Sequence, residues 1–181
     1  MKAQINIESS IRIGDTAPVV SGIDQDGEVF DSSVILENGP VLLIFYRGAW
    51  CPVCKKHLST VQDSLQLLLD KGVSVIVVTP EKSESIQKIV KKTRATFSII
   101  HDKDYKIMEA YGVSFKIGKE TVLRHYNFVL NSTREANENT DDILPVPATY
   151  LIGKDGTVRY VHYDPDYRNR SRVSKILTHL E

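Results

Sequence analysis

Cysteine is scarce in this chain, which has two cysteines and one tryptophan among 181 residues. Two cysteines cannot form the multiple crosslinks of small secreted folds, and with no second pair they cannot complete a four-cysteine zinc site. A chain of this length hides roughly 70% of its unfolded surface on folding, so its core is expected to be stable without crosslinks. The two cysteines are therefore free to carry chemistry.

Net charge and long apolar segments are also lacking. Lysine plus arginine and aspartate plus glutamate number 23 each, and the sequence pI is near 7.0, which argues against a binder of nucleic acid or anionic lipid. No window reaches the roughly 18 apolar residues of a membrane span, and the first residues lack a signal-peptide pattern. We expect a cytoplasmic protein without nucleic-acid or membrane partners, unless a leader precedes Met1.

The composition, with 41% hydrophobic and 25% charged residues, fits one globular domain. Continuous apolar runs at 40–46 and 73–80 predict strands buried on both faces, and the run at 97–100 predicts a shorter strand. Helical spacing of apolar residues follows the first two strands, at Cys54, Leu58, Val61, Leu65 and Leu68 and at Ile86, Ile89 and Val90. This alternation of strands and helices predicts right-handed βαβ units and a parallel sheet.

The two ends of the pattern differ from its middle. Asp-Gly pairs flanked by apolar runs predict antiparallel hairpins at 18–30 and at 149–163. The final apolar pattern predicts a helix at 171–180. The sheet is therefore expected to be mixed rather than wholly parallel.

Two segments lie between these parts. A short helix is expected at 104–112, with Asp104 as its N-cap and Gly112 just past its end. The stretch at 131–142 has one apolar residue in twelve and is predicted to be a solvated loop.

Both cysteines stand in the stretch AWCPVCKKH, directly after a predicted strand. Pro52 suits the first position of a helix, because its missing N–H would be unpaired there. Cys51 then occupies the N-cap, where free N–H groups and the helix dipole lower a thiol pKa from about 8.5 toward 7 or below. We expect Cys51 to be an exposed nucleophile and Cys54, on the apolar face, to keep a higher pKa. Further positive charge nearby comes from Arg47, Lys55 and Lys56.

Three other interpretations of the pair compete with redox chemistry. A structural disulfide would close a ring of four residues, worth roughly 1.9 kcal/mol against about 3 for a fifteen-residue loop. Cys51, Cys54 and His57 have the spacing C-x2-C-x2-H, but zinc usually needs a fourth ligand. Two inert buried thiols are the third possibility. The other histidines are scattered, at His101, His125, His162 and His179. A C-x-x-C pair in a βαβ setting favours redox chemistry.

The turn Trp50-Cys51-Pro52-Val53-Cys54-Lys55 resembles the Trp-Cys-x-x-Cys-Lys active site of thioredoxin-fold proteins. The surrounding pattern, including IGDTAPVVSGIDQDGEVF and VPATYLIGKDGTVRYVHY, resembles the redoxin branch, which contains the alkyl hydroperoxide reductase/thiol-specific antioxidant (AhpC/TSA, peroxiredoxin-like) family. The resemblance implies an α/β thioredoxin fold, a central mixed sheet flanked by helices with an N-terminal β-hairpin extension. It also implies one redoxin domain at 11–181 after a short extension at 1–10, and no bound cofactor or metal.

The resemblance further implies which residues contact the substrate. Val146-Pro147 corresponds to a cis-proline loop that faces the cysteines and whose backbone pairs with a bound peptide or thiol partner. Trp50, Pro52 and Arg47 are expected to line the same site.

Several residues depart from the two branches of the family. Peroxiredoxins carry Pro-x-x-x-Thr-x-x-Cys, whereas Arg47 and Gly48 stand where that proline and threonine would run. Pro147 replaces the peroxidase arginine, although Arg47 is a candidate substitute, and the Cys-Pro pair and the N-terminal hairpin remain redoxin-like. Phe45 stands where thioredoxins have a buried acid, so the usual proton acceptor is missing.

We therefore predict an oxidoreductase that exchanges thiols and disulfides, with Cys51 attacking a partner disulfide and Cys54 resolving the mixed disulfide. The alternative is a thiol peroxidase in which Cys51 becomes a sulfenic acid and Cys54 condenses with it. A metal- or partner-binding module without turnover is the third hypothesis. The expected partners are protein or small-molecule disulfides, hydroperoxides and an unidentified thiol reductant.

Overall fold

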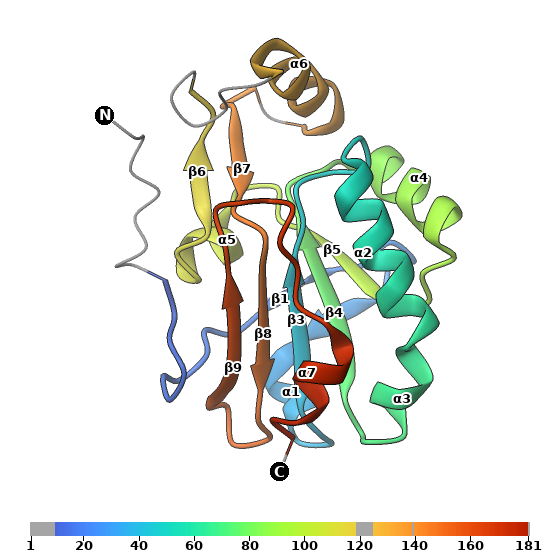
Figure 1. Cartoon of the computed structure of the whole chain (residues 1–181), viewed down its shortest axis with the longest axis vertical. Helices are drawn as coiled ribbons and strands as arrows, with labels where there is room; N and C mark the ends of the chain where they lie inside the picture. The colour runs from blue at the N-terminus through green and yellow to red at the C-terminus, as the bar shows by residue number, and fades with distance from the viewer. Residues whose placement is uncertain (1–9, 119–124, 139, 181) are drawn as a thin grey trace.

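Five strands form the central sheet of the computed structural model, which describes residues 10–118, 125–138 and 140–180 (Figure 1). The sheet has the order β5-β4-β3-β8-β9, in which β3, β4 and β5 are parallel, β8 is antiparallel to β3, and β9 is antiparallel to β8. The strands are β3 (Val41–Phe45), β4 (Ser74–Thr79), β5 (Ser98–His101), β8 (Ala148–Ile152) and β9 (Val158–Tyr163). The α/β fold with a mixed sheet is therefore confirmed, and of the extension expected at 1–10 only Ser10 lies within the described residues.

The strand that precedes the cysteines lies at the centre of this sheet. β3 is buried at all five positions, as expected for a continuous apolar run between two covered faces. Its last residue, Phe45, pairs with Val78 of β4 on one side and with Ala148 of β8 on the other. The chain leaves β3 at the carboxyl ends of the parallel strands β3, β4 and β5. Ligand sites in open α/β sheets usually lie there.

Four helices cover one face of the sheet: α2 (Pro52–Asp63), α3 (Leu65–Leu69), α4 (Ser83–Thr93) and α7 (Val173–Leu177). The predicted apolar stripe from Cys54 to Leu68 is buried in the core on this face. A break at Ser64, where the backbone leaves helical geometry, divides the single helix expected here into α2 and α3. The stripe continues across the break, so the packing prediction is confirmed.

The opposite face carries the N-terminal hairpin, β1 (Ser21–Ile23) and β2 (Val29–Asp31), with α1 (Ser32–Leu36) and α5 (Lys106–Ala110). Both predicted hairpins are present, and their turns use Gly27 and Gly156 at positive φ. No helix among the described residues is long and apolar enough to span a membrane.

The predicted N-cap of α5 is wrong. Tyr105 holds the cap position in a left-handed conformation, and the carboxylate of Asp102 accepts hydrogen bonds from the N–H groups of Ile107 and Met108, at 3.1 and 2.8 Å. Asp102 follows β5 directly and is buried, whereas Asp104 is exposed. The expected turn residue Gly112 does lie past the helix at positive φ.

The prediction of a loop at 131–142 is wrong for its first half. Helix α6 (Tyr126–Ala136) begins in the apolar stretch before it and buries Val129, Thr133 and Ala136. A small antiparallel pair, β6 (Ser114–Lys116) and β7 (Ile143–Pro145), stands beside α6 beyond the end of the main sheet, near the start of α2 (Figure 1). The count of apolar residues missed the helix because only one face of it is buried.

Candidate active site

The turn between β3 and α2 places Cys51 where the sequence predicts it, at the N-cap with Pro52 in the first helical turn. The Cys51 N–H donates to the carbonyl oxygen of Gly48 at 3.0 Å, which closes the turn. The Cys54 N–H in turn donates to Cys51 Sγ at 3.4 Å. The sulfur of Cys51 therefore serves as the capping acceptor that a serine or aspartate supplies in other helices.

The expected exposure of Cys51 is wrong. Cys51 is 2% exposed and Cys54 is 1% exposed, and both belong to the core cluster on the helical face of the sheet. Tyr46 and Ala49, from the same turn, lie in that cluster as well. The turn folds back into the core, so that Cys51 presents almost no surface to solvent.

The two thiols differ sharply in acidity. Hydrogen bonding from the Cys54 side chain is the largest influence on Cys51; together with the Cys54 N–H and the charges of Arg47 and Arg170 it outweighs desolvation and lowers the Cys51 pKa to about 6. Burial, followed by hydrogen bonding with Cys51, raises the pKa of Cys54 well above its usual value. At neutral pH the pair is therefore a thiolate at Cys51 beside a thiol at Cys54.

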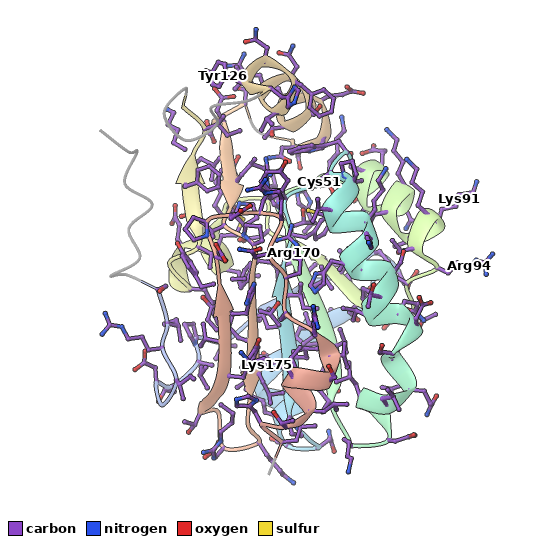
Figure 2. All side chains as sticks on the ribbon, in the orientation of Figure 1. Cys51, Lys91, Arg94, Tyr126, Arg170 and Lys175 are labelled. Carbon is purple, nitrogen blue, oxygen red and sulfur yellow. The ribbon has the colours of Figure 1, made fainter. Side chains whose placement is uncertain are left out.

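Arg170 is a site residue that the sequence analysis missed. Its Nη2 donates to Cys54 Sγ at 3.4 Å from the segment that leads into α7, and Figure 2 shows it below Cys51. Its Nη1 is buried without a hydrogen-bond partner in the part of the chain that the structure describes. In the sequence, Arg170 stood out only as part of the basic stretch YRNRSRVSK. Nothing there indicated a contact with Cys54, from which Arg170 is separated by 116 positions along the chain.

Arg47 lies in the site as expected, and it is 6% exposed. Its guanidinium sits between two aromatic rings, with Cζ 5.1 Å from the Trp50 ring centre and 4.5 Å from that of Tyr167. Its Nε is buried and makes no hydrogen bond to any described residue. Two guanidinium groups with unused N–H donors thus flank the sulfurs.

Trp50 connects the turn to the structure around α6. Its ring packs edge-on against Phe128, with centres 6.1 Å apart, and joins the small cluster of Ile117, Val129 and Leu144. A Cβ at Gly48 would collide with the Trp50 ring, which explains the glycine in this turn. Trp50 therefore fixes the active-site turn against the cluster around α6.

Glu81 is the second site residue that the sequence analysis missed. It lies two residues past β4, is 0% exposed, and accepts hydrogen bonds from the Tyr46 hydroxyl at 2.8 Å and the Ala49 N–H at 2.9 Å. Burial raises its pKa to about 7, and the negative charge of Cys51 contributes to that rise. A buried acid is therefore present, although not at position 45, where it was sought.

The loop at Val146 and Pro147 differs from the expectation. No cis peptide bond occurs among the described residues, so this bond is trans. The Val146 N–H donates to the carbonyl oxygen of Val113 at 2.7 Å and is not free to pair with a bound peptide. Pro147 does lie at the same end of the sheet as the active-site turn, because the next residue, Ala148, pairs with Phe45, the last residue of β3. Pro52, by contrast, is exposed at the start of α2.

His57 lines a groove between α2 and the segment before α7, with a volume of about 720 Å³. Burial and the nearby charge of Arg170 lower the His57 pKa to about 4, so the ring is neutral. No group of three or more histidine, cysteine, aspartate or glutamate side chains positioned to hold a metal occurs among the described residues. The C-x2-C-x2-H spacing therefore does not assemble a metal site in the described part of the chain.

Comparison with known proteins supports the resemblance. Residues 13–161 match the sequence profile of the AhpC/TSA family. Peroxiredoxin Bcp of Escherichia coli (strain K12) is 30% identical over 103 residues, which cover 57% of this chain and 65% of that protein, slightly less than two thirds of its length. Chloroplastic peroxiredoxin Q of Sedum lineare is 25% identical over 176 residues, covering 97% of this chain and 81% of that protein.

Among solved structures, the peroxidoxin BcpB of Mycobacterium tuberculosis is similar, with a TM-score of 0.71 at 21% identity over 94% of this chain and 96% of that one. At this identity the likeness concerns the fold. The profile match extends over most of the chain, from the N-terminal hairpin through β8 and into β9. The chain belongs to the AhpC/TSA family.

Proposed function

We propose that this protein is a two-cysteine thiol peroxidase, with Cys51 as the peroxidatic and Cys54 as the resolving cysteine. The observation that carries the proposal is the setting of Cys51, a residue that is 2% exposed and whose thiol has a lowered pKa in the field of Arg47 and Arg170. A buried thiolate favours a reactant as small as a hydroperoxide, and guanidinium N–H groups suit the oxygen on which negative charge develops. The family relatives named as peroxiredoxins support the same assignment.

The sequence alone favoured disulfides, because the peroxidase threonine and arginine are missing from their usual positions. Arg170 removes one of those two reasons, since it brings a guanidinium to the sulfurs from a distant segment. The threonine still has no replacement among the site residues. Disulfide exchange therefore becomes the second candidate, favoured by the adjacency of Cys51 and Cys54 within one helical turn.

The proposed reaction has two steps before re-reduction. The Cys51 thiolate attacks the terminal oxygen of ROOH, the O–O bond breaks, and the alkoxide leaves and takes a proton to give ROH, with Cys51 as sulfenic acid. The Cys54 thiol then attacks the sulfur of Cys51, forming the disulfide, and its proton leaves with the hydroxide as water. Two equivalents of an external thiol reduce the disulfide and become a disulfide themselves. The partners in this proposal are hydroperoxides and an unidentified thiol reductant, and we propose a cytoplasmic location.

Stopped-flow fluorescence tests the assignment directly, because Trp50 is the only tryptophan and lies beside Cys51. Mixing the reduced protein with hydrogen peroxide is expected to change the Trp50 fluorescence at a rate several orders of magnitude above that of free cysteine. A rate no faster than the free thiol rejects the peroxidase. In that case disulfide exchange predicts that Cys54→Ser traps partners as mixed disulfides and that Cys51→Ser traps none.

A further inference from the structure

Glu81 occupies an unusual place for a carboxylate. Both of its oxygens accept from the Ala49 N–H, and one also accepts from the Tyr46 hydroxyl, so its contacts are with the turn that carries Cys51. The following residue, Lys82, donates its N–H to the carbonyl oxygen of Ala136, which anchors this segment to α6. The carboxylate is therefore fixed in position between the active-site turn and α6.

The titratable and charged groups around Glu81 come from three parts of the chain. Cys51 at the start of α2 raises the carboxyl pKa when it is a thiolate, and Lys88 of α4 lowers it. Tyr46, directly after β3, donates its hydroxyl to the carboxylate, and burial raises the pKa of that hydroxyl well above its usual value. Tyr46 is therefore neutral at physiological pH, and Cys51 is the nearby group whose charge changes during the proposed reaction.

The proposed chemistry requires a proton at one step and releases one at another. Attack of the Cys51 thiolate on a hydroperoxide produces an alkoxide that must take up a proton. Condensation with Cys54 is balanced, because the Cys54 proton leaves as part of water. Reduction of the disulfide by a thiol then restores the Cys51 thiolate and leaves one proton over. A buried site without a local proton carrier would have to exchange that proton with solvent in every cycle.

We infer that Glu81 is a positioning residue that also balances the charge of the site, holding a proton while Cys51 is a thiolate and becoming a carboxylate when Cys51 is oxidised. This inference rests on the proposed redox function of the cysteine pair. Repulsion between the two negative groups links them, since loss of the thiolate charge removes one of the causes that keep Glu81 protonated. Glu81 thus releases a proton when Cys51 is oxidised and takes one up again when the disulfide is reduced.

Infrared difference spectra of the reduced and disulfide forms test this inference without depending on peroxide as the substrate, because diamide can make the disulfide. The wild type is expected to lose the C=O band of a protonated carboxyl group on oxidation at neutral pH and to regain it on reduction. Glu81→Gln should lack this change. Asp102→Asn is the matched control, because Asp102 is also buried and has a raised pKa, but its carboxylate accepts hydrogen bonds from the N–H groups of Ile107 and Met108 in α5. It should keep the change.

A second readout covers the case in which Glu81→Gln folds poorly. In weakly buffered wild type with a pH indicator, reaction with hydrogen peroxide would, without a proton from Glu81, consume one proton for each Cys51 thiolate present, so the thiolate fraction is measured by absorbance at the same pH. Between about pH 6 and 7 the uptake should be smaller than that fraction, because a protonated Glu81 releases its proton when Cys51 is oxidised. Uptake equal to the thiolate fraction at every pH, or an unchanged carboxyl band on oxidation, overturns the inference. Failure of peroxide alone, with the diamide spectra as expected, rejects the peroxidase and leaves the inference intact.

Discussion

Cys51 and Cys54 lie one helical turn apart and are almost equally buried, yet their pKa values move in opposite directions. Cys51 receives hydrogen bonds from the side chain and N–H of Cys54, which favour its thiolate. Burial, and then donation of that hydrogen bond, favour the protonated form of Cys54. His57, one turn further along α2, is likewise held neutral by burial. The first turn of α2 thus stabilises charge at its cap and penalises it on its core face. Burial is the main cause that raises the Cys54 pKa, whereas at Cys51 the hydrogen bonds from Cys54 and the arginine charges outweigh burial.

The largest effect is expected from replacing each of the two cysteines in turn. Cys51→Ser should abolish reaction with peroxide, because the low-pKa thiolate is gone. Cys54→Ser should still react once and accumulate a sulfenic acid that dimedone labels, since no resolving thiol remains. Mass spectrometry after peroxide treatment measures both outcomes. Labelling of Cys54 in the Cys51→Ser variant would contradict the assigned roles.

The cost of burying a charged His57 side chain against the core predicts that the stability of the protein depends on pH. The His57 pKa is about 4 in the fold and about 6.5 when unfolded, so the unfolded state binds a proton first, and stability falls as the pH drops from 6.5 to 4. The loss is on the order of 2 to 3 kcal/mol. Urea unfolding of His57→Gln should lack this part of the decline. The raised pKa of Glu81 acts in the opposite direction, so the variant is compared with wild type at each pH.

The exposed His125 provides a matched control for this experiment. His125→Asn should retain the wild-type dependence of unfolding free energy on pH, because the His125 side chain is exposed in the folded protein and is not transferred out of water on folding. An equal change in both variants would show that burial at His57 is not the cause.

The smallest effect is expected from the arginines near the cap. Arg170→Met removes a positive charge that lowers the Cys51 pKa, so that pKa should rise and the peroxide rate at pH 6 should fall by a factor of roughly 2 to 5. Arg172→Met, two residues away on an exposed side chain, serves as the control and should leave the rate unchanged. The pH dependence of iodoacetamide alkylation measures the shift. Equal behaviour of the two variants would remove Arg170 from the site.

Local chemistry explains what the sequence could predict. Pro52 after Cys51 indicated the N-cap, and the unbroken apolar run of β3 indicated a central strand, because both depend on neighbouring residues alone. Arg170 and Glu81 were not predictable in this way. Arg170 reaches Cys54 across 116 positions, and Glu81 becomes a site residue only because β4 ends beside β3.

The errors have the same origin. Asp104 had the right residue type for an N-cap, but the carboxylate of Asp102 reached the α5 N–H groups because of where β5 ends. Cys51 was expected to be exposed because nothing in its local sequence shows that the turn folds into the core. The trans bond at Pro147 departs from what the family resemblance implied. Local signals thus located the cysteine pair, while tertiary packing determined its surroundings.

The central claim, that one thiol of the pair is acidic and the other is not, is tested most directly by following thiolate absorbance of the reduced wild-type protein against pH. One thiolate should appear near pH 6, and no second one until well above the ordinary range of a cysteine thiol. Two thiolates appearing together, or none below the ordinary range of a cysteine, would contradict it.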